Sequence, residues 1–179
     1  MRFLLASFLM IAAGPLLAND WDALDQPGAF AIMRHALAPG VGDPDDFDVE
    51  DCATQRNLDD AGRAQARAIG QAFRERGHDF DVVLSSRWCR CLDTARLLDL
   101  GPVVEAPEFN SFFRDYDARA PQTEAALNRL AETDGRPFVV THQVNISALT
   151  GQGTRSGEVL VVRRDGDGLA VLGSILIRP

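Results

Sequence analysis

Gly28-Ala29-Phe30-Ala31-Ile32-Met33-Arg34-His35 is the stretch that most clearly indicates the fold of this chain. An apolar run that ends on a cation and an imidazole is typical of a buried strand that stops at the rim of a sheet. In open α/β sheets, ligands bind at the rim formed by the carboxyl ends of the strands. A second apolar run, Pro137-Phe138-Val139-Val140-Thr141, ends in the same way on His142. Two of the three histidines therefore share one context, and we predict that they belong to one site.

The apolar pattern of the rest of the chain alternates between short strand-like runs and longer helical stretches, which favours an α/β layer architecture. We expect Asp59 or Asp60 to cap the first helix and Gly77 to end it. The loop between the first strand and that helix is rich in aspartate, and we expect it to be solvated. Strands are predicted at 29–33, 82–84, 103–104, 138–141, 158–164 and 169–177, and helices at 61–76, from 85–86 to about 100, 123–133 and 146–149.

The first residues have the pattern of a secretory signal. Arg2 precedes an apolar stretch over 3–13, and Ala18 is a small residue at the expected cleavage point. A retained membrane anchor is the alternative, although the stretch is short for a hydrocarbon layer of about 30 Å. We therefore expect residues 1–18 to be a signal peptide, 19–179 to form one domain, and the protein to be periplasmic or secreted.

Charge and cysteine content restrict the partners that this chain can bind. The formal net charge of −8 argues against nucleic-acid binding through a general electrostatic field, so an anion would have to be bound by a local cluster of arginines. In an oxidising compartment Cys52 could pair with Cys89 or Cys91, and free thiols are the alternative. The spacing does not match a zinc site, and neither a metal nor a cofactor is expected.

The segment Ser85-Ser86-Arg87-Trp88-Cys89-Arg90 joins a predicted strand to a predicted helix. We expect the two serines to cap the helix and both arginines to lie near its start. Unpaired N–H groups at a helix start favour anions, and guanidinium groups match phosphate oxygens. The ends of three strands are therefore predicted to converge on one anion pocket.

These motifs resemble the histidine phosphatase (phosphoglycerate mutase-like) superfamily. The resemblance rests on Arg34-His35-Ala36, Ser85-Ser86-x-x-x-Arg90-x-x-x-Thr94-Ala95, Val139-Val140-Thr141-His142, and the stretch 56–66, which is similar to the family's first long helix. The chain is most similar to the small periplasmic branch, which includes lipopolysaccharide heptose phosphatases. The resemblance implies a three-layer α/β fold with a mostly parallel central sheet flanked by helices. It also implies a metal-independent phosphatase that hydrolyses an exported phosphomonoester through a phosphohistidine intermediate.

The resemblance further implies roles for individual residues. His35 would be the nucleophile, while Arg34, Arg90 and His142 would hold the phosphoryl oxygens. Arg56 is a looser candidate for a substrate contact. The polar residues Gln143 and Asn145, which follow the second histidine, could line the pocket.

The general acid is the open assignment. No acidic residue falls on the family's motif, so Asp115 is our preferred candidate for catalysis and Glu108 the next. Without a dedicated acid the substrate would need a good leaving group, such as a phosphohistidine or an acyl phosphate. A non-catalytic phosphate-binding module and a mutase are two competing hypotheses. The expected partner is a small phosphorylated molecule such as a cell-envelope sugar phosphate, with no nucleic acid and no stable membrane insertion after removal of the signal.

Overall fold

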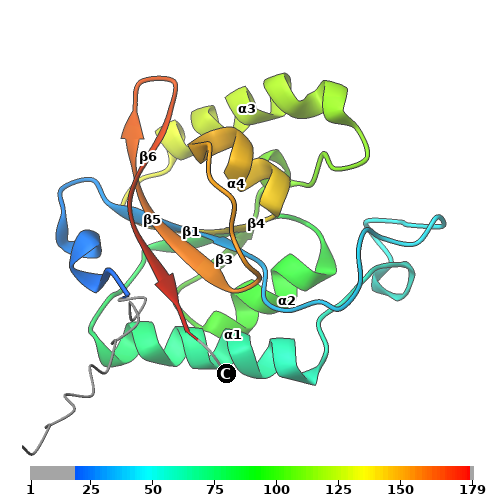
Figure 1. Ribbon diagram of the computed structural model, residues 1–179, viewed down its shortest axis with the longest axis horizontal. Helices are drawn as coiled ribbons and strands as arrows, with labels where there is room; N and C mark the ends of the chain where they lie inside the picture. The colour runs from blue at the N-terminus through cyan, green and yellow to red at the C-terminus, as the bar shows by residue number, and fades with distance from the viewer. Residues whose placement is uncertain (1–18, 178–179) are drawn as a thin grey trace, which may run out of the picture.

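A computed structural model describes residues 19–177, and they form a single six-stranded sheet with helices on both faces (Figure 1). The strand order is β3-β2-β4-β1-β5-β6. The first four strands in that order are parallel, and β5 and β6 add an antiparallel hairpin at one edge. The prediction of a mostly parallel sheet is confirmed. The strands are β1 (Phe30–Arg34), β2 (Val82–Ser85), β3 (Val103–Glu105), β4 (Pro137–Thr141), β5 (Glu158–Asp165) and β6 (Gly168–Leu176).

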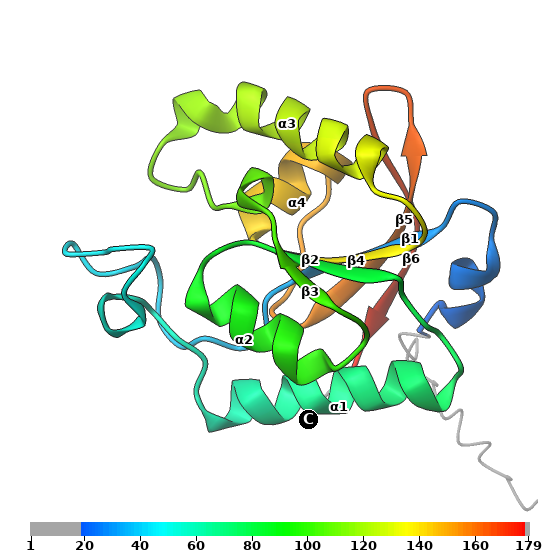
Figure 2. The ribbon, with the colours of Figure 1, turned by 180° about the vertical axis from the view of Figure 1, so that it is seen from behind.

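The helices complete the three predicted layers. Helices α1 (Asp60–Glu75) and α2 (Cys89–Leu98) cover one face of the sheet, and α3 (Arg119–Glu132) and α4 (Gln143–Thr150) cover the other (Figures 1 and 2). Within residues 19–177 no helix is long and apolar enough to cross a membrane. The expected signal peptide lies outside the described residues.

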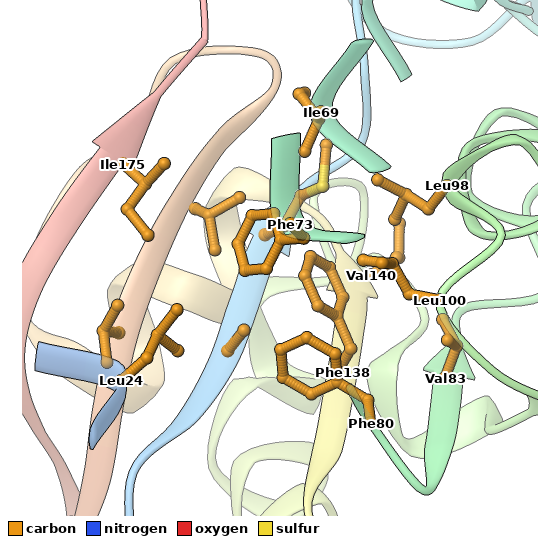
Figure 3. Packing of buried hydrophobic residues seen from close by; sticks show 14 of the residues in the cluster. Leu24, Ile69, Phe73, Phe80, Val83, Leu98, Leu100, Phe138, Val140 and Ile175 are labelled. Carbon is orange, nitrogen blue, oxygen red and sulfur yellow. The ribbon is translucent and has the colours of Figure 1, made fainter. Parts of the chain in front are cut away.

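Each face of the sheet has its own hydrophobic core. Beneath α1 and α2, Phe73 lies at the centre of a cluster that includes Phe80 and Phe138 (Figure 3). On the other face, α3 and α4 contribute Leu130 and Ile146. Strands such as β1 are buried on both faces, which explains their continuous apolar sequence.

The start of α1 matches the sequence prediction. The Asp59 side chain accepts a hydrogen bond from the Gly62 N–H, and Gly77, with φ of +71°, follows the end of the helix. A Cβ atom at Gly62 would lie 1.9 Å from the Leu37 carbonyl oxygen. Glycine therefore allows α1 to pack directly against the backbone that follows β1.

The second helix begins later than predicted. Trp88 rather than a serine stands at its N-cap, because Ser85 still belongs to β2 and the Ser86 N–H bonds to the Val140 carbonyl. Arg87 therefore precedes the helix, and its guanidinium pairs with glutamates instead of lying beside Arg90. The third helix begins earlier than predicted, at Arg119, and its buried residues are Ala126 and Leu130.

A disulfide joins Cys52, in the long loop between β1 and α1, to Cys89 at the first turn of α2. The structure thus selects one of the two predicted pairings. Cys91 is free and buried, and burial raises the pKa of its thiol to about 12. The bridge holds the loop, which extends from the body in Figure 1, against the helix that carries Arg90.

Candidate active site

Three neighbouring parallel strands bring the predicted site residues together. Strand β4 lies between β1 and β2, so the carboxyl ends of all three lie side by side. The His35 N–H continues the ladder by donating to the Thr141 carbonyl at 3.0 Å. The rings of His35 and His142 are 5.6 Å apart, centroid to centroid. Two histidines more than a hundred positions apart therefore meet at one rim of the sheet.

The imidazole of His35 is held in one tautomer. Its Nδ1 lies 2.7 Å from the Ala36 carbonyl oxygen, to which it can only donate, and its Nε2 accepts from Arg90 Nε at 3.2 Å. Burial, and then the positive charge of Arg90, lower the pKa of His35 well below its ordinary value. The ring is therefore neutral near pH 7, with a lone pair on Nε2.

Several elements fix the backbone around His35. Thr94 of α2 accepts a hydrogen bond from the Ala36 N–H at 3.0 Å, and Gln65 of α1 accepts one from the Leu37 N–H at 2.9 Å. The Gly157 N–H contacts the His35 carbonyl at 3.2 Å. Thr94 and Gln65 thus have structural roles that position the imidazole.

Arg90 is the centre of the site. One edge of its guanidinium faces His35, and its two terminal nitrogens face Asp43, with distances of 2.6 and 3.2 Å to the carboxylate oxygens. The side chains of Arg90 and Asp43 are only 4% and 11% exposed. The loop is exposed at Asp45 and Asp46, but the Asp43 side chain is withdrawn from solvent, contrary to the expectation from the sequence. Burial raises the pKa of Asp43, but the hydrogen bonds and charge of Arg90, together with hydrogen bonds from Trp88 and the Arg56 backbone, outweigh it, and the net pKa is lower than usual.

Two further arginines, Arg34 and Arg56, place their positive charge near Arg90. The buried Nε of Arg34 has no hydrogen-bond partner within the part of the chain that the structure describes. Arg56 donates to the carbonyls of Ala38 and Gly42. Burial, followed by repulsion from Arg90, lowers the pKa of both side chains. An unpaired, buried guanidinium nitrogen beside two other cations favours an anionic ligand.

His142 lies at the end of a polar chain. Its Nε2 is 2.9 Å from the Ser86 hydroxyl, which in turn lies 3.2 Å from the Asn110 side-chain oxygen. Its Nδ1 faces Arg90 at 3.4 Å. Burial and then Arg90 lower the pKa of His142 well below its usual value, so this ring is also neutral.

These side chains line a cavity of about 520 Å³. Four arginines and two aspartates face it, which makes the cavity positive although the whole chain is negative. Its mouth is aromatic, with Phe47 stacked on Trp88 and Phe113 close to Tyr116. A larger hollow of about 690 Å³ lies between α3 and the β5–β6 turn and contains no histidine. Among residues 19–177 no cluster of three histidine, cysteine, aspartate or glutamate side chains could hold a metal ion.

Of the other residues predicted from the sequence, Asp115 and Gln143 lie at the cavity and Glu108 does not. Asp115 lines the cavity, but it is exposed. Glu108 is not part of the lining. Gln143 lines the cavity, although its amide is engaged by Thr154 and Ser147.

The expectation that Asn145 lines the pocket is not met. Its side chain is 3% exposed, it donates to the Asn110 carbonyl, and it lies outside the lining. Sequence reasoning missed Asp43, Trp88 and Asn110. Trp88 could have been noticed because it lies inside the Ser85–Arg90 motif, whereas nothing distinguishes Asp43 from the neighbouring acidic residues.

Comparison with known proteins agrees with this geometry. Residues 32–112, which contain His35, Asp43 and Arg90, match the family model of the histidine phosphatase superfamily, branch 1. Over these residues the chain is similar to the histidine phosphatase superfamily. The prediction from the sequence motifs is confirmed at this level, as is the expected enzyme class, a phosphatase. No curated protein matches the sequence.

Solved structures share the fold of this chain. One is a protein from Agrobacterium tumefaciens assigned as phosphohistidine phosphatase SixA, with 23% identity and a TM-score of 0.59 over 84% of this chain and 98% of that one. A protein histidine phosphatase SixA complexed with tungstate has 17% identity and a TM-score of 0.53, over 82% and 96%. Phosphoserine phosphatase from Entamoeba histolytica in complex with 3-phosphoglyceric acid has 12% identity and a TM-score of 0.59, over 84% and 98%.

Proposed function

We propose that this phosphatase hydrolyses phosphomonoesters without a metal, through a phosphohistidine intermediate on His35. One observation supports this more than any other: the Nδ1–H of His35 is held by the Ala36 carbonyl, so the Nε2 lone pair faces Arg90 inside the cavity. A neutral imidazole with a fixed tautomer is a competent nucleophile near neutral pH.

The arginines supply the electrostatic part of the mechanism. In the first step Nε2 attacks phosphorus, and the bond between phosphorus and the leaving oxygen breaks with its electron pair on that oxygen. Charge on the phosphoryl oxygens is stabilised by Arg34 and Arg90. In the second step water attacks phosphorus, and the phosphorus–nitrogen bond breaks with its electron pair returning to His35. The buried, unpaired nitrogen of Arg34 is available for such an oxyanion.

His142 is proposed as a further donor to the phosphoryl group. In this structure Nδ1 of His142 faces Arg90 and can only accept a hydrogen bond. To donate from Nδ1 to a phosphoryl oxygen, the ring must adopt the other tautomer, with its proton on Nδ1. That tautomer requires the Ser86 hydroxyl, which donates to the Asn110 side-chain oxygen in this structure, to turn its single proton to Nε2 of His142.

The substrate we propose is a small phosphorylated molecule outside the cytoplasm. Structural neighbours are complexed with tungstate and with 3-phosphoglyceric acid, which supports a tetrahedral oxyanion on a small organic group. The Cys52–Cys89 disulfide supports an exported protein, in agreement with the expected signal peptide and a periplasmic or secreted location. A cell-envelope sugar phosphate is our candidate, with Arg56 and Gln143 near its organic part.

The test is covalent trapping with and without a chelator. Wild-type protein in EDTA should hydrolyse p-nitrophenyl phosphate and retain labelled phosphate after a rapid acid-free quench. His35→Ala should lose the label and at least about 100-fold in rate. His78→Gln is the matched control, because His78 lies outside the cavity and stacks on Trp21. A label that survives in His35→Ala would contradict the assignment, and phosphate binding without turnover would indicate a non-catalytic module.

A second candidate substrate is phosphohistidine, because two structural neighbours carry that activity in their names. Phosphoramidate is a simple probe, since it also has a phosphorus–nitrogen bond. A wild-type preference for phosphoramidate over alkyl phosphates would favour this candidate over a phosphomonoester.

A further inference from the structure

The carboxylate of Asp43 lies where the proposed mechanism needs a phosphoryl group. Both of its oxygens bond to the terminal nitrogens of Arg90, at 2.6 and 3.2 Å. The Trp88 indole N–H and the Arg56 backbone N–H also donate to it, at 3.1 and 3.2 Å. A carboxylate held by these donors resembles a bound oxyanion in charge and in its hydrogen-bond acceptors.

The position of the Asp43 carboxylate relative to the nucleophile His35 indicates which side of phosphorus it can reach. Arg90 presents its Nε edge to His35 and the opposite end of the guanidinium to Asp43. In phosphoryl transfer the attacking and leaving atoms lie roughly in line on opposite sides of phosphorus. A phosphoryl group that takes the place of the carboxylate on Arg90 displaces Asp43 away from His35, toward the side where the leaving oxygen departs.

We propose that Asp43 is the proton donor to the leaving oxygen, and that a phosphoryl group recruits it by taking its place on Arg90. This inference rests on the proposed phosphatase function and adds a residue to its mechanism. The other acid of the cavity, Asp115, is exposed, whereas the Asp43 side chain is only 11% exposed and bonds to Arg90, which contacts both histidines.

The exchange of partners explains how a carboxylate paired with arginine can become an acid. While Arg90 holds it, Asp43 is ionised. A phosphate monoanion that binds Arg90 removes those hydrogen bonds and places a negative charge beside the carboxylate, so the proton of the monoanion moves favourably to Asp43.

The proton on Asp43 is transferred when the phosphorus–oxygen bond breaks. As Nε2 of His35 bonds to phosphorus, the phosphorus–oxygen bond breaks, and Asp43 gives its proton to the departing oxygen, which leaves as a neutral alcohol. In the second step Asp43 accepts a proton from the attacking water and is an acid again. When the product leaves as the phosphate monoanion it takes this proton from Asp43, and the carboxylate returns ionised to Arg90, so that protons and electron pairs balance over the cycle without another reactant.

The experiment compares two substrates that differ in their need for an acid. p-Nitrophenyl phosphate has a good leaving group, and glycerol 2-phosphate has a poor one. Asp43→Asn should reduce kcat on glycerol 2-phosphate by about 100-fold or more and on p-nitrophenyl phosphate by less than about 10-fold. Equal losses on both substrates, or no loss, would overturn the proposal.

The matched controls separate proton donation from folding and binding. Asp46→Asn changes an exposed acid of the same loop and should leave both rates at the wild-type level. Asp43→Asn should bind inorganic phosphate at least as tightly as wild type, because the competing carboxylate is gone. If Asp115→Asn rather than Asp43→Asn showed the selective loss, Asp115 would be the donor and the proposal would be wrong.

One measurement does not depend on a variant that must fold. Across a series of phosphate esters the wild-type kcat/KM should depend weakly on the pKa of the leaving alcohol, and a steep dependence would exclude a proton donor. Wild-type protein that neither hydrolyses p-nitrophenyl phosphate nor labels His35 would refute the proposed function itself. Normal labelling with an unselective Asp43→Asn variant would refute only the role of Asp43.

Discussion

At the scale of single residues, the site depends on keeping two imidazoles neutral beside three guanidiniums. His35 and His142 are 2% and 4% exposed, and both face Arg90. A proton on either ring would place a second buried cation beside the first. The same burial that prepares the nucleophile therefore links the stability of the fold to pH.

This linkage gives a prediction for unfolding. In the unfolded chain histidines take up protons as the pH falls below about 6.5, whereas in the folded protein burial and Arg90 lower the pKa of both rings. The unfolded state thus binds more protons in that range, and the free energy of unfolding must decrease as pH falls below about 6.5. The slope is at most about 1.4 kcal/mol per pH unit for each ring.

Urea unfolding between about pH 8 and about pH 5 measures this slope. His35→Gln and His142→Gln should each make it shallower, because each removes one of the buried rings. A slope that is the same in wild type and in both variants would show that other groups control the acid response.

At the scale of elements, the loop between β1 and α1 delivers Asp43 and Arg56 to the cavity. The loop has little regular structure, and the disulfide at Cys52 ties it to the first turn of α2, one residue before Arg90. The covalent link therefore joins the part of the loop that supplies the acid to the helix that supplies the arginine.

Removing the bridge should affect both stability and binding. Cys52→Ser opens a covalent loop with a sequence separation of 37 residues, and we expect a loss of about 2–4 kcal/mol in the free energy of unfolding. We also expect the KM for p-nitrophenyl phosphate to rise more than kcat falls, because the loop becomes less ordered. Urea unfolding and steady-state kinetics measure the two effects.

A reductant supplies the control for this prediction. It should reproduce the Cys52→Ser values in wild-type protein and have no further effect on the variant. Unchanged wild-type kinetics after complete reduction would mean that the loop keeps its position without the bridge.

At the scale of the whole molecule, stability and chemistry are concentrated in different places. The core beneath α1 is built on Phe73, whose ring contacts Phe80 and Phe138 (Figure 3). The Phe73 ring also contacts Trp21. None of these four residues lines the cavity at the rim of the sheet.

Phe73→Ala should therefore separate folding from function. Loss of a fully buried aromatic ring costs about 3–5 kcal/mol in the free energy of unfolding. The fraction that remains folded should bind inorganic phosphate with an affinity within a few-fold of wild type. Unfolding and phosphate titration on the same sample test both statements, and a large loss of affinity would show that the core controls the site.

Local patterns in the amino-acid sequence were sufficient to predict the strands, their ends and the family. Apolar runs such as 137–141 and the capping residue Asp59 act locally, so their pattern is visible in the order of the residues. The motifs around Arg34, Arg90 and His142 predicted a resemblance to the histidine phosphatase superfamily, because short spacings are visible in the sequence itself.

Long-range packing, in contrast, selects the acidic residue that enters the cavity and the cysteine that closes the loop. The loop carries many similar carboxylates, and its path over α2 brings Asp43 to Arg90 and Cys52 to Cys89. The path depends on contacts between residues distant in sequence, such as Trp88 with Asp43 and Phe47, and no local pattern encodes those contacts. For the same reason Asn145 was expected from its position to face the pocket, whereas packing against Asn110 turns it inward.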